Sequence, residues 1–136
     1  NLSEYIERHR QEYYDRLLHV SQEGRWELWL NFFLRGVSEQ SQNSIVRMER
    51  LYEIRAKYQP VMDDNRLPNR MSAIIDFLFS RPILSIRQVA EGVNLPYKTA
   101  QDYIEKLVSA GILHEITGYS RNRIYRAEEV IRVLQE

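Results

Sequence analysis

Apolar residues at helical spacing divide the last part of the chain into two short helices. Ser85 and Gln88 form an S-x-x-Q capping box, so we expect the first helix over Ser85–Gly92. Residues 93–95 predict a tight turn, and a second helix opens at Pro96 and runs to about Ala110. The apolar positions of the second helix recur at i, i+4, i+7 and i+8 and are expected to pack inward. They are Ala100, Ile104, Leu107 and Val108.

The residues that follow have the pattern of a β-hairpin. Residues 111–116 predict a stop at Gly111 and then a strand, residues 118–122 a turn, and residues 123–126 the return strand. Two helices, a tight turn and a hairpin in this order make a winged helix-turn-helix. In that arrangement the second helix can enter the major groove of DNA while the hairpin wing lies on the adjacent backbone.

The first sixty or so residues are patterned as helices throughout. Ser3 is the expected N-cap of a helix that runs to about Val20, and Gly24 with the two residues before it ends that helix. A second apolar pattern starts near Trp26 and continues to Tyr58. We expect a bend or break in it between residues 36 and 44, because a glycine in a helix interior costs about 1 kcal/mol relative to alanine.

Large aromatic side chains are concentrated at the start of this second pattern. Trp26, Trp29 and Phe33 lie on one broad apolar face, and a buried aromatic side chain covers roughly 150–250 Å². That much apolar surface fits either an ordinary helical core or an interface with a partner, which is another chain or a missing upstream domain. We therefore treat these three residues as a candidate partner interface.

The pattern as a whole predicts a mainly α fold, with a helical N-terminal segment followed by an α+β winged helix-turn-helix domain. We expect the helical segment over residues 1–60, a linker over 61–68 and the winged helix over 69–136. The linker lies between Pro60 and Pro68, is polar and lacks helical periodicity. The sequence begins with Asn1 rather than methionine, so we expect it to be part of a longer protein.

Composition narrows the classes of function. The 136 residues contain no cysteine, which excludes disulfides, thiolate metal sites and cysteine catalysis. No apolar run has the length of a membrane span or signal peptide, so we expect no membrane partner and a cytoplasmic location. Basic and acidic residues both number 19 and the net charge is zero, which counts against tight non-specific DNA binding.

The expected DNA-contacting residues lie on the second helix and the wing. Residues 94–126 carry five basic and three acidic side chains, a net charge of +2, which suits weak DNA binding and protein docking comparably well. Asp102 and Glu105 on the outer face of the second helix repel a DNA backbone. The candidate nucleic-acid contacts are Tyr97, Lys98, Thr99, Gln101, Lys106, Arg121, Asn122 and Arg123.

Catalytic and metal signals are weak. His9 and His19 are expected on one helix about 15 Å apart, too far for a shared metal ion, and His114 stands alone in a strand. We expect all three histidines at the surface. Asp63 and Asp64 are adjacent carboxylates, and their place in the expected linker is typical of a solvated turn. We therefore predict no catalytic residue and no metal site.

Two stretches resemble the C-terminal part of bacterial Fic-family proteins, which transfer AMP from ATP to protein hydroxyls. Arg10–Leu17 (RQEYYDRL) and residues 24–37 (GRWELWLNFFLRGV) are similar to the pattern that closes the helical Fic core in a common subfamily. Residues 95–100 (LPYKTA), 111–118 and 121–125 (RNRIY) are similar to the winged helix that follows that core. The order and spacing of these segments also match.

The family's catalytic motif, HPFxDGNGRxGR, is absent from the sequence, and no histidine is followed by Pro-Phe. The resemblance implies a non-catalytic C-terminal module of a Fic-type AMP-transferase, whose winged helix binds DNA or a protein partner. This chain then needs no cofactor, while ATP and Mg belong to the parent enzyme if it is active. The alternative is a stand-alone winged-helix transcriptional regulator that forms a homodimer through a helical arm.

Overall fold

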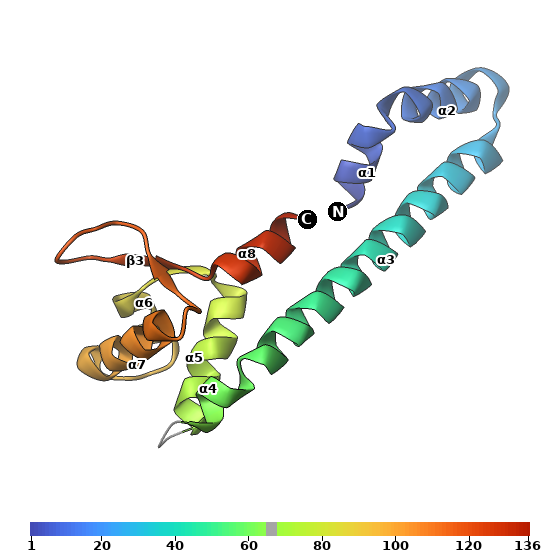
Figure 1. Cartoon of the computed structure of the whole chain (residues 1–136). Helices are drawn as coiled ribbons and strands as arrows, with labels where there is room; N and C mark the ends of the chain where they lie inside the picture. Colours follow the sequence, from blue (N-terminus) through green and yellow to red (C-terminus); the bar gives the residue numbers. More distant parts are fainter. Residues whose placement is uncertain (65–67) are drawn as a thin grey trace. The chain divides into compact units, whose positions relative to one another are not determined.

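The computed structural model describes residues 1–64 and 68–136 (Figure 1). It is mainly helical, with a small antiparallel sheet, which confirms the expected fold class. The chain divides into two compact units, Asn1–Met48 and Glu49–Glu136. The helices of the first unit are α1 (Leu2–Arg8), α2 (Arg10–Glu23) and the N-terminal part of α3 (Trp26–Lys57).

The first helix differs from the expected one at both ends. The cap is Asn1 rather than Ser3, because the Asn1 side chain accepts a hydrogen bond from the backbone N–H of Ser3, which is already helical. The expected single helix to Val20 is also wrong: His9 has a non-helical ψ of 33° and separates α1 from α2. Gly24 ends α2 as expected, in the left-handed conformation with a φ of 65°.

The bend expected between residues 36 and 44 is absent, because α3 is a continuous helix over Trp26–Lys57. The reason for a glycine at position 36 is packing. A Cβ atom on Gly36 would lie 2.5 Å from the ring of Tyr5, which is itself buried against Phe32. Gly36 thus allows α1 to approach α3 closely, and this contact offsets the intrinsic helix cost of glycine.

The division into compact units falls inside α3 rather than at the expected linker over residues 61–68. Much of the described part of that stretch is helical, since α4 spans Gln59–Asp63 with Pro60 in its first turn. Proline is well tolerated there because the first N–H groups of a helix have no partner inside the helix. Residues 65–67 of the expected linker lie outside the described residues.

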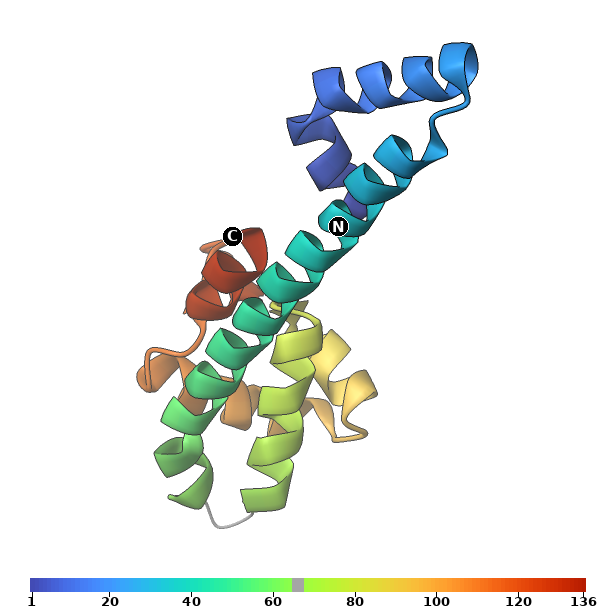
Figure 2. The ribbon, with the colours of Figure 1, turned by 90° about the vertical axis from the view of Figure 1, so that its right-hand side faces the viewer.

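The second unit has the connectivity of the expected winged helix. After α5 (Pro68–Ser80) come β1 (Ile83–Ser85), α6 (Ile86–Gly92), α7 (Tyr97–Ser109), β2 (His114–Glu115), β3 (Ile124–Arg126) and α8 (Glu128–Gln135). Within the described ranges the strands form one antiparallel sheet in the order β1-β3-β2. Figure 2 shows α5 beside the C-terminal turns of α3, where Arg55 donates a 2.7 Å hydrogen bond to Asp76.

The helix-turn-helix follows its local signals closely. Ser85 and Gln88 make both hydrogen bonds of the capping box at the start of α6. Asn94 supplies the left-handed residue of the turn, with a φ of 55°. Of the residues expected to pack inward on α7, all but Val108 are buried, and Val108 is 37% exposed. Tyr103 takes its place in the core, because it lies on the same side of the helix as Ala100 and Leu107.

Candidate nucleic-acid interface

The pairing of β1 with β3 creates a cleft between the helix-turn-helix and the wing. Ser85 pairs with Ile124 in the sheet register, so the start of α6 and the base of the wing are neighbours. The cleft has a volume of about 440 Å³. It is lined by Ser85, Ile86, Arg87, Tyr97 and residues 120–124.

The cleft is lined by positively charged side chains. The exposed side chains of Arg87, Arg121 and Arg123 all line it, and no Asp or Glu is among its described lining residues. Tyr97, the first residue of α7, lies at the same cleft and is 54% exposed. Guanidinium groups bind phosphate oxygens through paired, charge-assisted hydrogen bonds. The cleft can therefore bind a phosphate-bearing ligand.

Arg87 is a cleft residue that is not among the expected contacts. It belongs to the first turn of α6, outside residues 94–126, which contain the expected contacts. Its proximity to the wing depends on the pairing of Ser85 with Ile124, which joins residues far apart in the sequence. The signal for Arg87 in the sequence is a basic residue that comes just after the capping residue Ser85.

The wing is held in shape by its own hydrogen bonds. The Glu115 carboxylate accepts from the hydroxyl and N–H of Thr117 and from the N–H of Gly118. These bonds, foremost the one from the Thr117 side chain, lower the pKa of Glu115. Arg123 adds a 2.7 Å hydrogen bond from its Nε atom to the carbonyl oxygen of Tyr119. Such a wing loses little conformational freedom when it binds a ligand.

Three further expected contact residues on α7 lie outside this cleft lining. Lys98 is exposed, and its Nζ atom lies 3.2 Å from Asp102 one helical turn away. Thr99 and Gln101 are only partly exposed. A lysine in the first turn of a helix opposes the helix dipole at a cost of about 0.3–1 kcal/mol. The carboxylate of Asp102 offsets part of that cost and partly neutralises Lys98.

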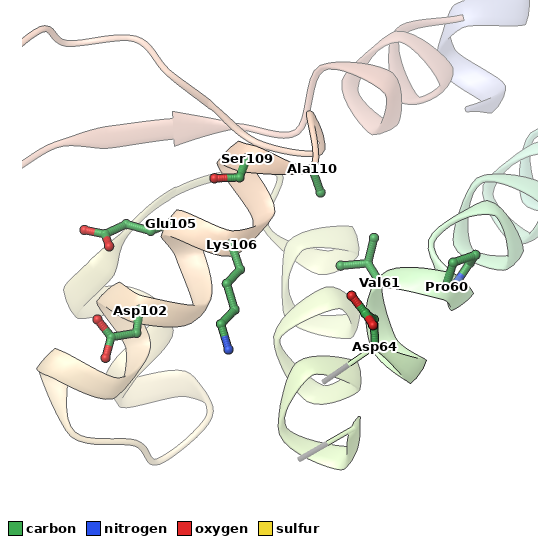
Figure 3. Close-up of a pocket in the computed structure, with 8 residues that line it drawn as sticks. All are labelled: Pro60, Val61, Asp64, Asp102, Glu105, Lys106, Ser109 and Ala110. Atoms are coloured by element: carbon green, nitrogen blue, oxygen red, sulfur yellow. The ribbon is translucent and has the colours of Figure 1, made fainter. Parts of the chain in front are cut away.

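Lys106, the remaining expected contact, belongs to a different groove, between α7 and α4 (Figure 3). This groove has a volume of about 1040 Å³, and Asp64, Asp102 and Glu105 also line it. Figure 3 shows the Lys106 side chain extending from α7 into this groove. Its Nζ atom lies 5.3 Å from the centre of the Tyr103 ring. The structure thus places Tyr97, Arg121, Asn122 and Arg123 together and Lys106 in acidic surroundings.

The candidate partner interface lies in the first compact unit. Trp26 is 59% exposed, whereas Trp29 and Phe33 are partly buried and stack on each other with ring centroids 5.4 Å apart. Further exposed apolar side chains follow Trp26 at helical spacing along α3. They are Leu30, Leu34 and Val37. An exposed apolar strip of this length on one helix face is typical of surfaces that are covered by a partner.

The expected surface position of the histidines holds for His114, which is exposed, while His9 and His19 are half-buried. His9 lies at the break between α1 and α2, where its Nδ1 atom is 2.9 Å from the carbonyl oxygen of Tyr5.

Of the helices in the described ranges, none is long and apolar enough to cross a membrane. No protein-family model matches the chain.

Proposed function

We propose that this chain is a non-catalytic module that binds double-stranded DNA through its winged helix. The N-terminal end of α7 enters the major groove, and the wing lies on the adjacent phosphate backbone. The observation that carries the proposal is the cleft between α6, α7 and the wing, which collects Arg87, Arg121 and Arg123 without a carboxylate among its described lining residues.

The distribution of charge on α7 supports this orientation. The acidic side chains Asp102 and Glu105 line the groove toward α4, whereas Tyr97 lines the basic cleft. A DNA backbone that follows the wing and the start of α7 therefore meets mostly positive charge. Because the whole chain has a net charge of zero, we expect weak binding that depends strongly on salt.

The N-terminal unit has a separate role in the proposal. The apolar strip of Trp26, Leu30, Leu34 and Val37 is exposed along α3 and needs a partner. The resemblance of residues 10–37 to the end of a Fic core leads us to propose that this partner is the rest of such a core. The chain is then the C-terminal module of an AMP-transferase whose catalytic motif, ATP and Mg belong to another part of the protein.

The DNA proposal is tested by fluorescence-anisotropy titration of the chain against random and genomic duplexes at about 50 and 200 mM salt. We expect saturable binding that weakens with salt. Arg121→Ala and Arg123→Ala should weaken binding similarly for every sequence, because phosphate contacts carry no sequence information, and each should make the salt slope shallower by about 0.9. Arg132→Ala on α8 is the matched control for loss of one positive charge.

Gln101 gives a second readout of the same titration. An amide side chain can recognise adenine by hydrogen bonds to the N6 and N7 atoms of the base. Gln101→Ala should therefore reduce the differences in affinity between DNA sequences more than it changes the mean affinity. Absence of binding at tens of micromolar protein, where non-specific contacts usually register, would overturn the DNA proposal.

The partner of the N-terminal unit is tested by sedimentation velocity over a range of concentrations. An apolar strip made to fit a missing core predicts open-ended association, because such a strip is not self-complementary and does not close into a dimer. Leu34→Glu should reduce that association, and Glu7→Gln on α1 serves as a control away from the strip. A single well-defined dimer that dissociates on dilution would instead support the stand-alone regulator with a dimerisation arm.

A further inference from the structure

The basic cleft is larger than a backbone phosphate requires. Its volume of about 440 Å³ falls within the range of roughly 300–1,000 Å³ that is usual for small-molecule sites. A wing that only rests on duplex phosphates needs surface charge and no hollow of this size. The size of the cleft therefore indicates a ligand with more than a phosphate group.

The lining of the cleft combines an aromatic ring with cations. Tyr97 is 54% exposed, and Arg87, Arg121 and Arg123 line the same space. Any of the nucleic-acid bases can stack on an exposed aromatic ring, and guanidinium groups bind phosphate oxygens. Ser120 and Asn122 add polar groups at the same cleft that can hydrogen-bond to a sugar or a base edge.

We propose that this cleft binds a nucleoside phosphate whose base is not stacked in a duplex. The base stacks on Tyr97, and the phosphate is held by the guanidinium groups of Arg87, Arg121 and Arg123. The ligand is either an unpaired nucleotide of a DNA strand or a free nucleotide, since both present the same chemistry. This inference deepens the proposed function, because it names what the cleft binds beyond the backbone of a duplex.

The base of a paired nucleotide is not available to Tyr97, because it is stacked between its neighbours. A duplex can therefore use the guanidinium groups of the cleft but not the aromatic ring, unless a nucleotide leaves the stack at an energetic cost. The proposal thus separates two sets of contacts. The arginines contribute to binding of every phosphate-bearing ligand, and Tyr97 contributes only when the base is free.

The test is a heteronuclear NMR titration of the full chain with three probes: thymidine 5′-monophosphate, a short oligothymidylate and a blunt duplex. We expect the first two probes to shift the resonances of residues 85–87, 97 and 120–124. Tyr97→Leu should weaken binding of both by about five- to a hundredfold, as expected for loss of one stacked base, and leave the duplex nearly unaffected. Tyr119→Leu is the matched control, because Tyr119 is an exposed wing tyrosine outside the cleft lining.

The outcomes distinguish this inference from the proposed function. An oligothymidylate that binds more tightly than the monophosphate assigns the ligand to a strand, and equal affinities assign it to a free nucleotide. Binding of the duplex with no effect of either thymidine probe on the cleft would overturn the inference and leave the proposed function intact. Tyr97-dependent binding of the thymidine probes without any duplex binding would support the inference and overturn the proposed function.

Discussion

Removal of the Asp102 carboxylate should increase DNA affinity. Asp102 lies 3.2 Å from the Nζ atom of Lys98, one of the positively charged side chains nearest to the N-terminal end of α7. In Asp102→Asn the lysine no longer has this counter-charge and becomes available to a phosphate. An improvement in binding is especially informative, since misfolding lowers affinity and does not raise it.

The size of the gain follows from the charges involved. Two unit charges about 4 Å apart in water interact by about 1 kcal/mol, which corresponds to a roughly fivefold change in affinity. One additional phosphate contact should also make the salt slope steeper by about 0.9. Both side chains of the pair are more than half exposed, so the loss of the ion pair itself should cost the fold no more than about 0.5 kcal/mol.

The assay is the anisotropy titration at about 50 and 200 mM salt. Glu49→Gln is the matched control, because it removes one negative charge from an exposed position on α3 and raises the net charge by the same amount. We expect Asp102→Asn to bind more tightly than Glu49→Gln, with the difference shrinking as salt rises. Equal affinities for the two variants would refute the placement of DNA along the start of α7.

Three further predictions concern the fold that holds the site. Ser85→Ala removes the cap of α6 and should lower stability by about 1 kcal/mol, measured by thermal unfolding; an unchanged melting temperature would contradict the capping role. Gly36→Ala should destabilise the first unit by about 1–3 kcal/mol because the new methyl group meets the Tyr5 ring, and increased resistance to denaturant would show that the ring moves freely. The pKa of Glu115 is lowered in the folded protein, so its carboxylate stabilises the wing at pH values above the usual pKa range of a glutamate. This stabilisation is lost as the pH falls through the lowered pKa. NMR titration of the Gly118 amide should follow that transition, and a pH-independent amide shift would count against it.

The local signals of the sequence were sufficient to predict an element and its bounds where that element is determined by its own residues. The capping box at Ser85, the left-handed glycine at Gly24 and the boundaries of α7 all depend on contacts within a few positions. Short-range hydrogen bonds of this kind can be recognised from residue types at fixed spacing. For that reason the helix-turn-helix and the hairpin were predicted with nearly the right bounds.

The errors arose where distant residues decide the local structure. The periodicity of residues 3–20 cannot show that the chain breaks at His9, because that break accompanies the packing of Tyr5 near Gly36 on another helix. The same contact makes Gly36 compatible with a straight helix. Long-range packing of this kind commonly overrides intrinsic propensity.

The candidate site was only partly predictable for a similar reason. Tyr97 and Arg123 were expected to contribute from their places in the motif, and both line the cleft. Arg87 joins them only because β1 pairs with β3, and Lys106 faces the acidic groove because of where α4 lies. The sequence supplies residue types and helix faces, whereas the neighbours of each face depend on the tertiary fold.

We propose that DNA contacts this chain at the cleft between α6, α7 and the wing. The most direct measurement is mapping of duplex-induced amide and side-chain shifts by NMR, with the full chain at low salt. We expect shifts concentrated at Arg87 and residues 120–124, with little change at Asp64 and Ser109 in the acidic groove between α7 and α4. Shifts concentrated in that groove, or no shifts at tens of micromolar duplex, would contradict it.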